Sequence, residues 1–445
     1  MQTLLVANRG EIAARIIRTA AGMGITTVAV YSEADAELPY VADADVAVAI
    51  GPPAPAESYL DVEAILEAAR RTGADAIHPG YGFLSENADF AERVMAAGLT
   101  WVGPPPAAMR AMGDKVAARN LMAAAGVPVA PGSSEPLHTA EQALAEAEAI
   151  GYPVMVKASA GGGGIGMSVA RDPEELRAAF ETARSRAERF FADPALLVER
   201  FVAAARHVEV QVLGLADGRV VALGERDCSV QRRHQKVAEE SPSPAVGREL
   251  RERIAAIAVA AGEAVHYRNA GTVELLLDTE SGEVWFLEMN TRLQVEHPVT
   301  EMVTGLDLVA EQLRIAAGMA PTFGDHPPAP QGHALEMRVY AEDPQRFLPR
   351  PGTISRWEEP NGEHIRVDGG YRAGNKVTPF YDPLLAKLIV WADTRDAMLA
   401  RARAAVEAFH IEGPKNNLPF FVELLDEHEF VGGDYTTGLI DRMRS

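Results

Sequence analysis

The sequence predicts a mixed α/β and α+β protein with three regions. In chain order these are an N-terminal parallel α/β domain, a central region with a glycine-rich hairpin, and a C-terminal mixed domain rich in strands. Short apolar runs alternate with helical patterns through the first hundred residues, four consecutive glycines follow Lys157, and a proline-rich stretch precedes the last strands. A chain of 445 residues is long enough for about three domains.

Residues 1–113 carry the pattern of a parallel sheet covered by helices. Apolar runs such as TLLVAN, TTVAVYS and ADAIHPG alternate with helical stretches such as EIAARIIRTAAGMG and VEAILEAARRTG. The first strand-to-helix turn reads ANRGEIA and has a lone glycine, so the GxGxxG fingerprint of nicotinamide or flavin binding is missing. We therefore expect an α/β domain without a dinucleotide site.

The glycine run lies in KASAGGGGIGM, residues 157–167. Glycine loses much conformational freedom on folding, so this run is costly inside a strand or helix. Apolar runs lead in and out of it, which indicates a hairpin tip and not a flexible linker. Bare backbone N–H groups beside Lys157 suit close approach to phosphate oxygens.

Lysine is scarce in this chain. Only six lysines occur among the 42 basic residues, at 115, 157, 236, 376, 387 and 415. A lysine that remains in an arginine-rich chain is mildly enriched for sites that need a compact point charge, such as phosphate contacts. For any single lysine, the alternative that it is present by chance is equally plausible.

The segment 271–300 predicts a metal site on a β-hairpin. Two apolar runs flank the turn composition DTESG, and symmetry about Ser281 places Glu274 opposite Glu288. Directly opposed residues have Cβ atoms about 4.5 to 5.5 Å apart, so the two carboxylates repel unless a cation lies between them. Mg²⁺ or Mn²⁺ binds hard oxygen ligands of this kind.

The second strand of this hairpin is expected to continue to Pro298 with a polar face. Period-two alternation places on that face Glu288, Asn290, Arg292, Gln294 and Glu296. A solvated sheet face is the alternative, but the mixture of acid, amide and guanidinium suits a metal, an anion and a base in order along one strand.

Upstream segments add polar candidates. The stretches AARHVEVQVLG and GERDCSVQRRHQKVAEESP contribute His207, Gln231, His234 and Lys236. A basic surface loop is the alternative for QRRHQK, and a lone histidine is more often structural than functional. Downstream, we expect an amphipathic helix near 302–318, a linker at 322–332 and a last unit at 333–445.

The totals exclude several classes of protein. A formal net charge of -21 argues against nucleic acid or an anionic membrane as the main partner. The sequence has neither a membrane-length apolar run nor a recognisable signal segment, so we expect a cytoplasmic protein. The single Cys228 permits no internal disulfide and is expected to be a packed residue, not a nucleophile.

Eight motifs together closely resemble the biotin carboxylase family across nearly the whole chain. They are ANRGEIAARIIR, HPGYGFLSEN, MGDK, KASAGGGGIGM, ERDCSVQRRHQK, EMNTRLQVEHPVTE, HALEMRVYAEDP and YDPLLAKLI. The resemblance implies an ATP-grasp domain at 114–321, with a mobile lid at about 131–203, between the N-terminal domain and the C-terminal domain. It also implies Mg²⁺ or Mn²⁺, ATP, bicarbonate, a separate biotin carboxyl carrier protein, carboxyltransferase subunits and usually a homodimer.

The resemblance also assigns roles to residues. For ATP binding it implies Lys115, Lys157, Gly161, Gly162, Gly163, Gly164, Gly166, Glu199, Arg200, Val202, His207, Gln231 and His234. The implied metal ligands are Glu274, Glu288 and Asn290. For bicarbonate and biotin it implies Lys236, Arg292, Gln294, Val295 and Arg338, with Glu296 as general base. The implied catalytic residues are Lys236, Arg292, Glu296 and Arg338.

The reaction implied by the resemblance has two steps. Glu296 deprotonates bicarbonate as it attacks the γ-phosphate of ATP, which gives carboxyphosphate. Carboxyphosphate then breaks down to CO₂ and a phosphate that deprotonates biotin, while Arg338 stabilises the ureido oxygen. The six lysine contexts do not match the AMKM motif of biotin attachment, and the chain ends soon after the last unit, so biotin is expected on a separate carrier.

Two other functions are weighed against this one. Carbamoyl phosphate synthetase and aminoimidazole ribonucleotide carboxylating enzymes share the Mg-ATP carboxylates but are not expected to carry Arg338 or YDPLLAKLI. A catalytically silent nucleotide-binding subunit is disfavoured by intact Lys236, Arg292, Glu296 and Arg338. One departure from the family is Ile165, where the lid loop often has a basic residue.

Overall fold

The N-terminal region folds as a parallel sheet with helices on both faces, as predicted. The computed structural model describes residues 1–159, 167–191 and 194–445, so Gly161, Gly162, Gly163, Gly164, Ile165 and Gly166 lie outside the described residues. Within these ranges the first sheet has the order β3-β2-β1-β4-β5, and its neighbours pair in parallel. Leu4 and Leu5 of β1 are both fully buried and belong to different apolar clusters, so both faces of the sheet are covered.

The elements of this region have the following bounds. The strands are β1 (Thr3–Val6), β2 (Thr26–Ser32), β3 (Val46–Gly51), β4 (Ala76–His78) and β5 (Thr100–Trp101). The helices are α1 (Gly10–Gly22), α2 (Pro39–Asp43), α3 (Val62–Thr72), α4 (Ala88–Ala96) and α5 (Pro106–Gly113), with short 3₁₀ turns at Glu33–Asp35 and Pro55–Glu57.

A small antiparallel sheet follows, and it carries the arms of the glycine-rich hairpin. β6 (Val154–Ala158) pairs antiparallel with β7 (Ser168–Ala170), which confirms the predicted hairpin arms. β8 (Leu196–Arg200) pairs with the other edge of β6. α7 (Ala140–Ile150) and α8 (Pro173–Phe191) cover this sheet, and α6 (Lys115–Ala124) precedes it.

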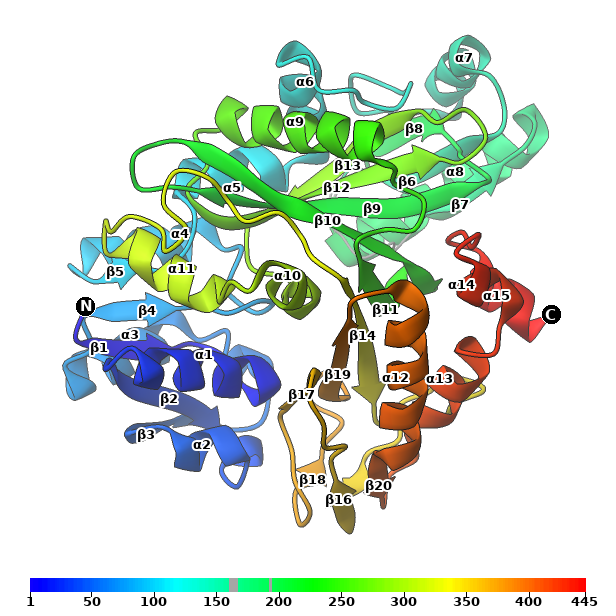
Figure 1. Cartoon of the computed structure of the whole chain (residues 1–445). Coiled ribbons are helices and arrows are strands. Elements are labelled where there is room, and N and C mark those ends of the chain that lie inside the picture. Colours follow the sequence, from blue (N-terminus) through cyan, green and yellow to red (C-terminus); the bar gives the residue numbers. More distant parts are fainter. Residues whose placement is uncertain (160–166, 192–193) are drawn as a thin grey trace.

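One long antiparallel sheet of the described residues runs through the centre of the molecule (Figure 1). Its strand order is β13-β12-β9-β10-β11-β14-β19-β17. The strands are β9 (Ala205–Gly214), β10 (Val220–Arg232), β11 (Gln235–Ser241), β12 (Asn269–Asp278), β13 (Val284–Asn290), β14 (His333–Tyr340), β17 (Ile365–Gly369) and β19 (Leu384–Ala392). The pairing of β11 with β14 joins the central region to the C-terminal region within a single sheet.

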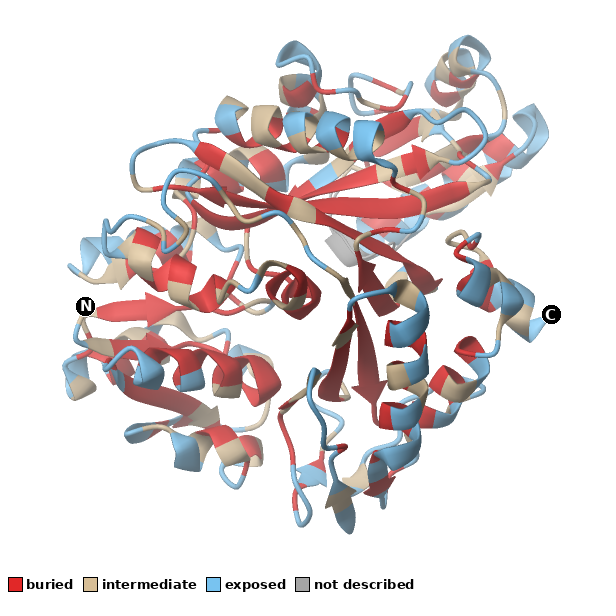
Figure 2. Ribbon diagram, in the orientation of Figure 1, coloured by how far each residue is buried: buried red, intermediate tan, exposed pale blue. Residues whose placement is uncertain are grey.

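Helices shield this sheet from solvent. α9 (Arg248–Ala264) packs on β9 and β10, and Figure 2 shows the central strands buried beneath helices whose outer faces are exposed. The remaining C-terminal elements are β15 (Gly352–Thr353), β16 (Arg356–Glu358), β18 (Lys376–Val377), β20 (His410–Glu412), α12 (Arg395–Ala408), α13 (Leu418–Leu424), α14 (His428–Gly432) and α15 (Leu439–Arg444).

Two predicted elements differ in the structure. The single helix expected near 302–318 is two helices, α10 (His297–Thr304) and α11 (Leu308–Ala316). Gly305 ends α10 in the left-handed region at φ 74°, which favours glycine, and the Asp307 side chain caps the start of α11.

The polar strand expected to reach Pro298 is also shorter than predicted. β13 ends at Asn290, and residues 291–296 form an irregular loop. Glu296 is the N-cap residue of α10, and Pro298 lies in its first turn. Backbone N–H groups in the first turn have no partner within the helix, so the missing N–H of proline costs nothing there. Pro298 therefore belongs to the start of a helix and does not terminate a strand.

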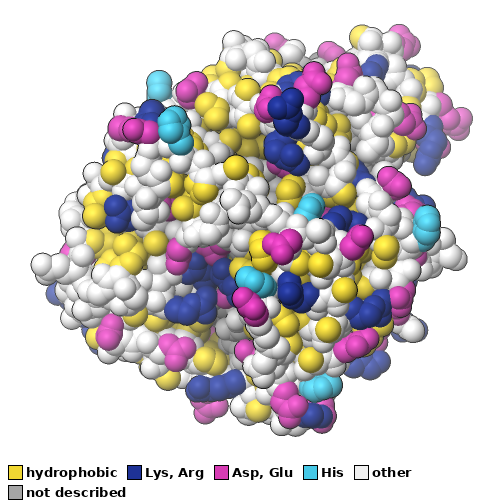
Figure 3. All heavy atoms as spheres, in the orientation of Figure 1, with side chains coloured by type: hydrophobic (Ala, Val, Ile, Leu, Met, Phe, Trp, Pro, Cys, Tyr) yellow, Lys and Arg dark blue, Asp and Glu magenta, His cyan; other side chains and the backbone are white. Residues whose placement is uncertain are grey.

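The surface is chemically mixed. On the face shown in Figure 3, Lys and Arg side chains are interspersed with Asp and Glu over much of the view. Within the described ranges, every helix is too short or too polar to span a lipid bilayer.

Candidate active site

The hairpin of β12 and β13, for which a metal site is predicted, forms in the predicted register. Glu274 on β12 lies directly opposite Glu288 on β13, and Thr272 lies opposite Asn290, which confirms the symmetric pairing. A bulge then shifts the ladder by one residue, so that Leu275 faces Phe286. Asn290 Nδ2 donates to Glu274 Oε1 at 2.9 Å, so the predicted ligand side chains are neighbours.

The two opposed carboxyl groups have different environments. Glu274 is buried, and although desolvation alone would raise its pKa, Lys236 and His207 hold that pKa below its ordinary value. Glu288 is the more exposed of the two, and its pKa is raised by desolvation and by repulsion from Glu274. The repulsion between opposed carboxylates is thus present, as the hairpin geometry requires.

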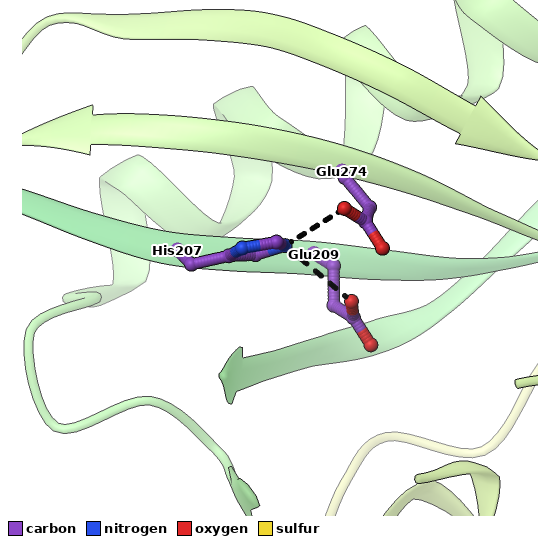
Figure 4. A group of neighbouring side chains, drawn as sticks. All are labelled: His207, Glu209 and Glu274. Carbon is purple, nitrogen blue, oxygen red and sulfur yellow. Dashed lines mark ion pairs between the residues drawn. The ribbon is translucent and has the colours of Figure 1, made fainter. Parts of the chain in front are cut away.

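His207 of β9 lies beside Glu274 and Glu209 (Figure 4). Its Nε2 lies 3.0 Å from Glu274 Oε2 and 3.8 Å from Glu209 Oε2. Gln231 Nε2 lies 2.8 Å from His207 Nδ1, and with that nitrogen as acceptor the ring proton is on Nε2, toward Glu274. Desolvation lowers the pKa of His207, but Glu274 outweighs it and the pKa is raised. Gln231 and His207, both predicted, are therefore in contact.

Lys236 is the cation at the centre of the site. Its Nζ donates to Glu209 at 2.6 Å, to Glu274 at 2.8 Å and to Glu296 at 2.7 Å. A register shift in β11 between Lys236 and Ala238 inserts one extra residue in this strand. Burial opposes the charge on Lys236, yet its three carboxylate partners raise its pKa well above the ordinary value.

Glu209 and Arg226 are central residues that the sequence analysis missed. Both are fully buried, and Arg226 Nε donates to Glu209 Oε1 at 2.5 Å. The other guanidinium nitrogens of Arg226 donate to the side chains of Gln211, Thr272, Gln294 and Thr300. The alternation in HVEVQV could have indicated Glu209, since it shares a strand face with His207.

The loop at 291–296 brings the remaining predicted residues to the same place. Arg292 Nε donates to Glu86 Oε2 at 2.9 Å, so a residue of the N-terminal region holds it. Gln294 Nε2 donates to Glu274 Oε1 at 2.7 Å, which joins the loop to the β12–β13 hairpin. Glu86 was another residue that the sequence analysis did not identify, although it lies in the motif HPGYGFLSEN.

Glu296 lies between two cations. Its Oε1 accepts from Lys236, and its Oε2 accepts from Arg338 at 2.9 Å. Burial would raise the pKa of Glu296, but Lys236, Arg338 and Arg226 together hold it well below its usual range. Cys228 Sγ is 4.0 Å from Glu296 Oε1, and burial raises the pKa of this thiol, so it is a packed neighbour of the site, not a ready nucleophile.

Arg338 of β14 also contacts a second carboxylate. Its Nη2 lies 2.6 Å from Glu239 Oε1 on β11, and all three side chains of this Glu239–Arg338–Glu296 row are buried. Desolvation opposes the charge on Arg338, but Glu239 and Glu296 raise its pKa well above the ordinary value. The guanidinium is therefore permanently charged and held on one side by Glu239.

The predicted phosphate lysines come from the central strand of the small sheet and from the start of α6. Lys157 on β6 pairs with Glu199 on β8. Desolvation and the nearby charge of Lys157 lower the pKa of Lys115, while Glu288 and Glu199 oppose this effect. Two lysines near one another, with a carboxylate from each sheet close by, are typical of a site for a polyanion that lies between them.

Three other predicted residues lie away from the carboxylates bonded to Lys236. Arg200 is exposed and donates to the Ile150 carbonyl at 3.2 Å, and Val202 packs in a small apolar cluster with Ala205 and Trp285. His234 lies on the exposed turn between β10 and β11, where desolvation lowers its pKa. The structure does not bring these three side chains into the Lys236 cluster.

Comparison with known proteins gives consistent matches over nearly the full length. Residues 1–109 match the biotin carboxylase N-terminal domain, 114–321 the ATP-binding domain of the carbamoyl-phosphate synthase L chain, and 336–442 the biotin carboxylase C-terminal domain. A biotin carboxylase from Halalkalibacterium halodurans is 53% identical over 437 residues, which are 98% of this chain and 96% of that protein.

Solved structures match equally well. The biotin carboxylase complex with β,γ-ATP from Campylobacter jejuni superimposes with a TM-score of 0.96 at 42% identity, covering 99% of this chain and 98% of that one. The biotin carboxylase domain dimer of Hydrogenobacter thermophilus 2-oxoglutarate carboxylase, in complex with MgADP, ADP and bicarbonate, gives 0.95 at 44% identity, covering 99% and 97%.

Proposed function

Because the chain belongs to the biotin carboxylase family, we propose that the cluster around Lys236 and Glu296 is the centre at which it carboxylates biotin. The family reaction consumes ATP and bicarbonate and forms carboxybiotin, ADP and phosphate, the first half-reaction of biotin-dependent carboxylases. The observation that carries the assignment is the position of Glu296, with one oxygen on Lys236 and the other on Arg338.

The metal ligands we propose are Glu274, Glu288 and Asn290. The residues fit a hard divalent cation, because two opposed carboxylates and one carboxamide lie together on adjacent strands. The Asn290 carboxamide donates from Nδ2 to Glu274 and accepts at Oδ1 from Arg292, so its oxygen is the atom that a cation would take over. Bound Mg²⁺ or Mn²⁺ would neutralise charge on the ATP phosphates. The raised pKa of Glu288 also fits, since that carboxyl gains most from a cation beside it.

We assign ATP binding to the side of the site that faces the small sheet. Lys115 and Lys157 supply positive charge for the phosphates, and the glycine run between β6 and β7 supplies backbone N–H groups. Glu199, Arg200 and Val202 belong to the segment that contacts the base, mainly through the backbone. His207, Gln231 and His234 complete the proposed nucleotide contacts.

Glu296 is the proposed general base for bicarbonate. In the structure both of its oxygens accept from cations, so it is a weak base. Bicarbonate bound by Lys236, Arg292 and Arg338, with Gln294 and the backbone of Val295 beside it, takes over these donors. Glu296 then becomes more basic and accepts the bicarbonate proton as the bicarbonate oxygen attacks the γ-phosphorus and ADP leaves.

Arg338 serves the second step in this proposal. Carboxyphosphate breaks down to CO₂ and phosphate, and the phosphate takes the proton of the biotin N1′ nitrogen. The Arg338 guanidinium, held by Glu239 from behind, stabilises the negative charge that develops on the ureido oxygen. The nitrogen then attacks CO₂ to give carboxybiotin.

The assembly we propose has the biotin on a separate biotin carboxyl carrier protein, with carboxyltransferase subunits for the second half-reaction. The six lysine contexts, none of which matches AMKM, support a separate carrier. We also propose a homodimer working in the cytoplasm, with the N-terminal domain at 1–113, the ATP-grasp domain at 114–321 and its lid at 131–203, a linker at 322–332 and the C-terminal domain at 333–445.

The deciding test is an assay of ATP cleavage. We expect phosphate release that requires both bicarbonate and free biotin, and we expect Glu296→Gln to lower it about 10²- to 10⁴-fold, the usual contribution of a general base. A rate of ATP cleavage that does not depend on bicarbonate, or a fully active Glu296→Gln protein, would exclude the proposed centre.

A further inference from the structure

Two of the sequence motifs have no role in the site described above, ANRGEIA at the start of α1 and YDPLLAKLI on β19. The structure places them against each other and against the loop that carries Glu296. Their meeting point is Lys387, which is fully buried and lies in register with Arg338 across the β14–β19 ladder.

Lys387 touches the active-site loop through the backbone. Its Nζ donates to the carbonyl oxygen of Val295 at 3.0 Å. Because the peptide unit is planar, a donor that fixes this carbonyl also fixes the direction of the Glu296 N–H and the position of its Cα. The contact therefore acts on the residue immediately before the side chain that lies between Lys236 and Arg338.

The same ammonium group is balanced by acids from two other elements. Lys387 Nζ is 3.0 Å from Glu11 Oε2 on α1 and 4.0 Å from Asp368 Oδ2 on β17. Glu11 and Asp368 are both buried, but Asp368 also pairs with Arg366 at 2.6 Å and Arg18 at 2.8 Å, so Glu11 is the acid for which Lys387 is the nearest cation. A lysine suits this position because its ammonium offers three donors on a long stem.

Close packing holds α1 against this lysine. A Cβ atom at Gly370, next to the end of β17, would lie 2.7 Å from the backbone nitrogen of Glu11, so only glycine allows this approach. Arg9, one residue before α1, donates to the Tyr371 hydroxyl at 3.1 Å. The start of α1 is thereby fixed beside Lys387.

We propose that Lys387 is a positioning residue for the general base: it holds the Val295 carbonyl, sets the orientation of Glu296, and uses Glu11 of the N-terminal domain as its counter-charge. This inference rests on the proposed role of Glu296. In this role the two motifs act together: ANRGEIA supplies Glu11 as the counter-charge, and YDPLLAKLI supplies Lys387 as the donor to the Val295 carbonyl. A purely structural ion pair would need Glu11 and Asp368 but not the bond to the loop.

The test compares three variants with a matched control. Lys387→Met removes the donor and leaves Glu11 buried without its nearest cation, so it loses both stability and turnover. The double variant Glu11→Gln/Lys387→Met removes both charges, so its melting temperature recovers toward that of the wild type while the Val295 carbonyl still lacks its donor. Glu11→Gln alone keeps the donor and loses less turnover than Lys387→Met. Lys376→Met, at an exposed lysine of β18, is the control.

We expect kcat of the folded double variant to be about 10²-fold below the wild type, a typical result of misplacing a reacting group by about 1 Å. Calorimetric affinity for ATP is expected to be unchanged, because the proposed nucleotide residues lie elsewhere. Recovery of kcat together with stability in the double variant would show a structural role only and overturn the proposal. Glu296→Gln is measured in parallel, and full activity in that variant would instead defeat the proposed function itself.

Discussion

Glu239 on β11 and Glu336 on β14 lie directly opposite each other, and both side chains are fully buried. Among the described residues, the carboxyl oxygens of both groups lack a hydrogen-bond partner, although Glu239 Oε1 forms an ion pair with Arg338 at 2.6 Å. Desolvation raises the pKa of both groups, that of Glu239 to about 7. Two buried carboxyl groups in opposed positions thus hold their protons to a higher pH than exposed ones, beside the guanidinium of Arg338.

The first prediction concerns the pH dependence of stability. Between about pH 4.5 and pH 7 the unfolded Glu239 is ionised while the folded one keeps its proton. Protonated Glu239 therefore contributes its full share of the folding free energy at pH values below the ordinary pKa of 4.5. That share falls as the pH rises through the folded-state pKa of about 7, and the total loss is about 3 kcal/mol at most. We expect the melting temperature of Glu239→Gln, relative to wild type, to increase between pH 4.5 and 8.

Thermal melts at a series of pH values measure this difference. Glu249→Gln on the exposed side of α9 is the control, and its difference from wild type is expected to be flat across the range. A difference for Glu239→Gln that is equally flat would contradict the raised pKa.

The second prediction concerns the metal. Glu288→Gln removes one charged ligand from the proposed site, and Glu288 is exposed, so stability depends little on it. We expect the apparent KM for Mg²⁺ to rise about tenfold or more, which corresponds to about 1.4 kcal/mol of binding free energy. The melting temperature without metal is expected to change little. Titration of Mg²⁺ in the ATP cleavage assay is the measurement, and a normal Mg²⁺ dependence would remove Glu288 from the site.

The third prediction concerns Arg226. Arg226→Met removes one of the two cations bonded to the buried Glu209 and leaves only Lys236, and we expect a loss of about 3 to 5 kcal/mol of unfolding free energy, the usual cost of breaking a buried pair. Arg226→Met/Glu209→Gln is expected to recover part of that loss. Denaturant unfolding is the measurement, with Arg248→Met on exposed α9 as control. A loss no larger than that of the control would mean that Arg226 is not needed to compensate Glu209.

The fourth prediction concerns biotin. Since none of the six lysines lies in an AMKM context, we expect no biotin on this polypeptide after expression with an active biotin ligase. A streptavidin blot, with a known carrier protein as positive control, measures this directly. A biotinylated band at the mass of this chain would contradict the proposal of a separate carrier.

Local features of the sequence predicted the hairpin well. A turn composition between two apolar runs fixes the register of an antiparallel pair, so the opposition of Glu274 and Glu288 follows from the order of residues alone. The same reasoning failed beyond Asn290. There the alternation of polar and apolar residues comes from contacts with Glu86, Arg226 and Lys387 on distant elements, and not from a pleated strand.

Contacts between distant strands could not be predicted from composition or periodicity. Arg226 bonds Thr272, Gln294 and Thr300 from later parts of the chain. Glu239 lies on β11, whose neighbour β14 is distant in sequence, and a bulge in β11 changes which of its residues share a face. The residue pattern singled out Lys236 and Glu296, the resemblance to a family added their roles and Arg338, and the structure brings all three together. The resemblance did not supply Glu209, Arg226 or Glu86, because the family motifs indicate residue roles and not packing.

The joint between β11 and β14 has a consequence for dissecting this protein. A cut between residues 321 and 333 would leave Ala238–Ser241 on one fragment and Ala334–Met337 on the other as open sheet edges, with their backbone N–H and C=O groups unpaired. Such edges pair readily with other chains, so separately expressed halves are expected to aggregate unless they are produced together. Because Lys236 and Arg338 lie on the two sides of this joint, neither half would retain a complete set of donors for Glu296.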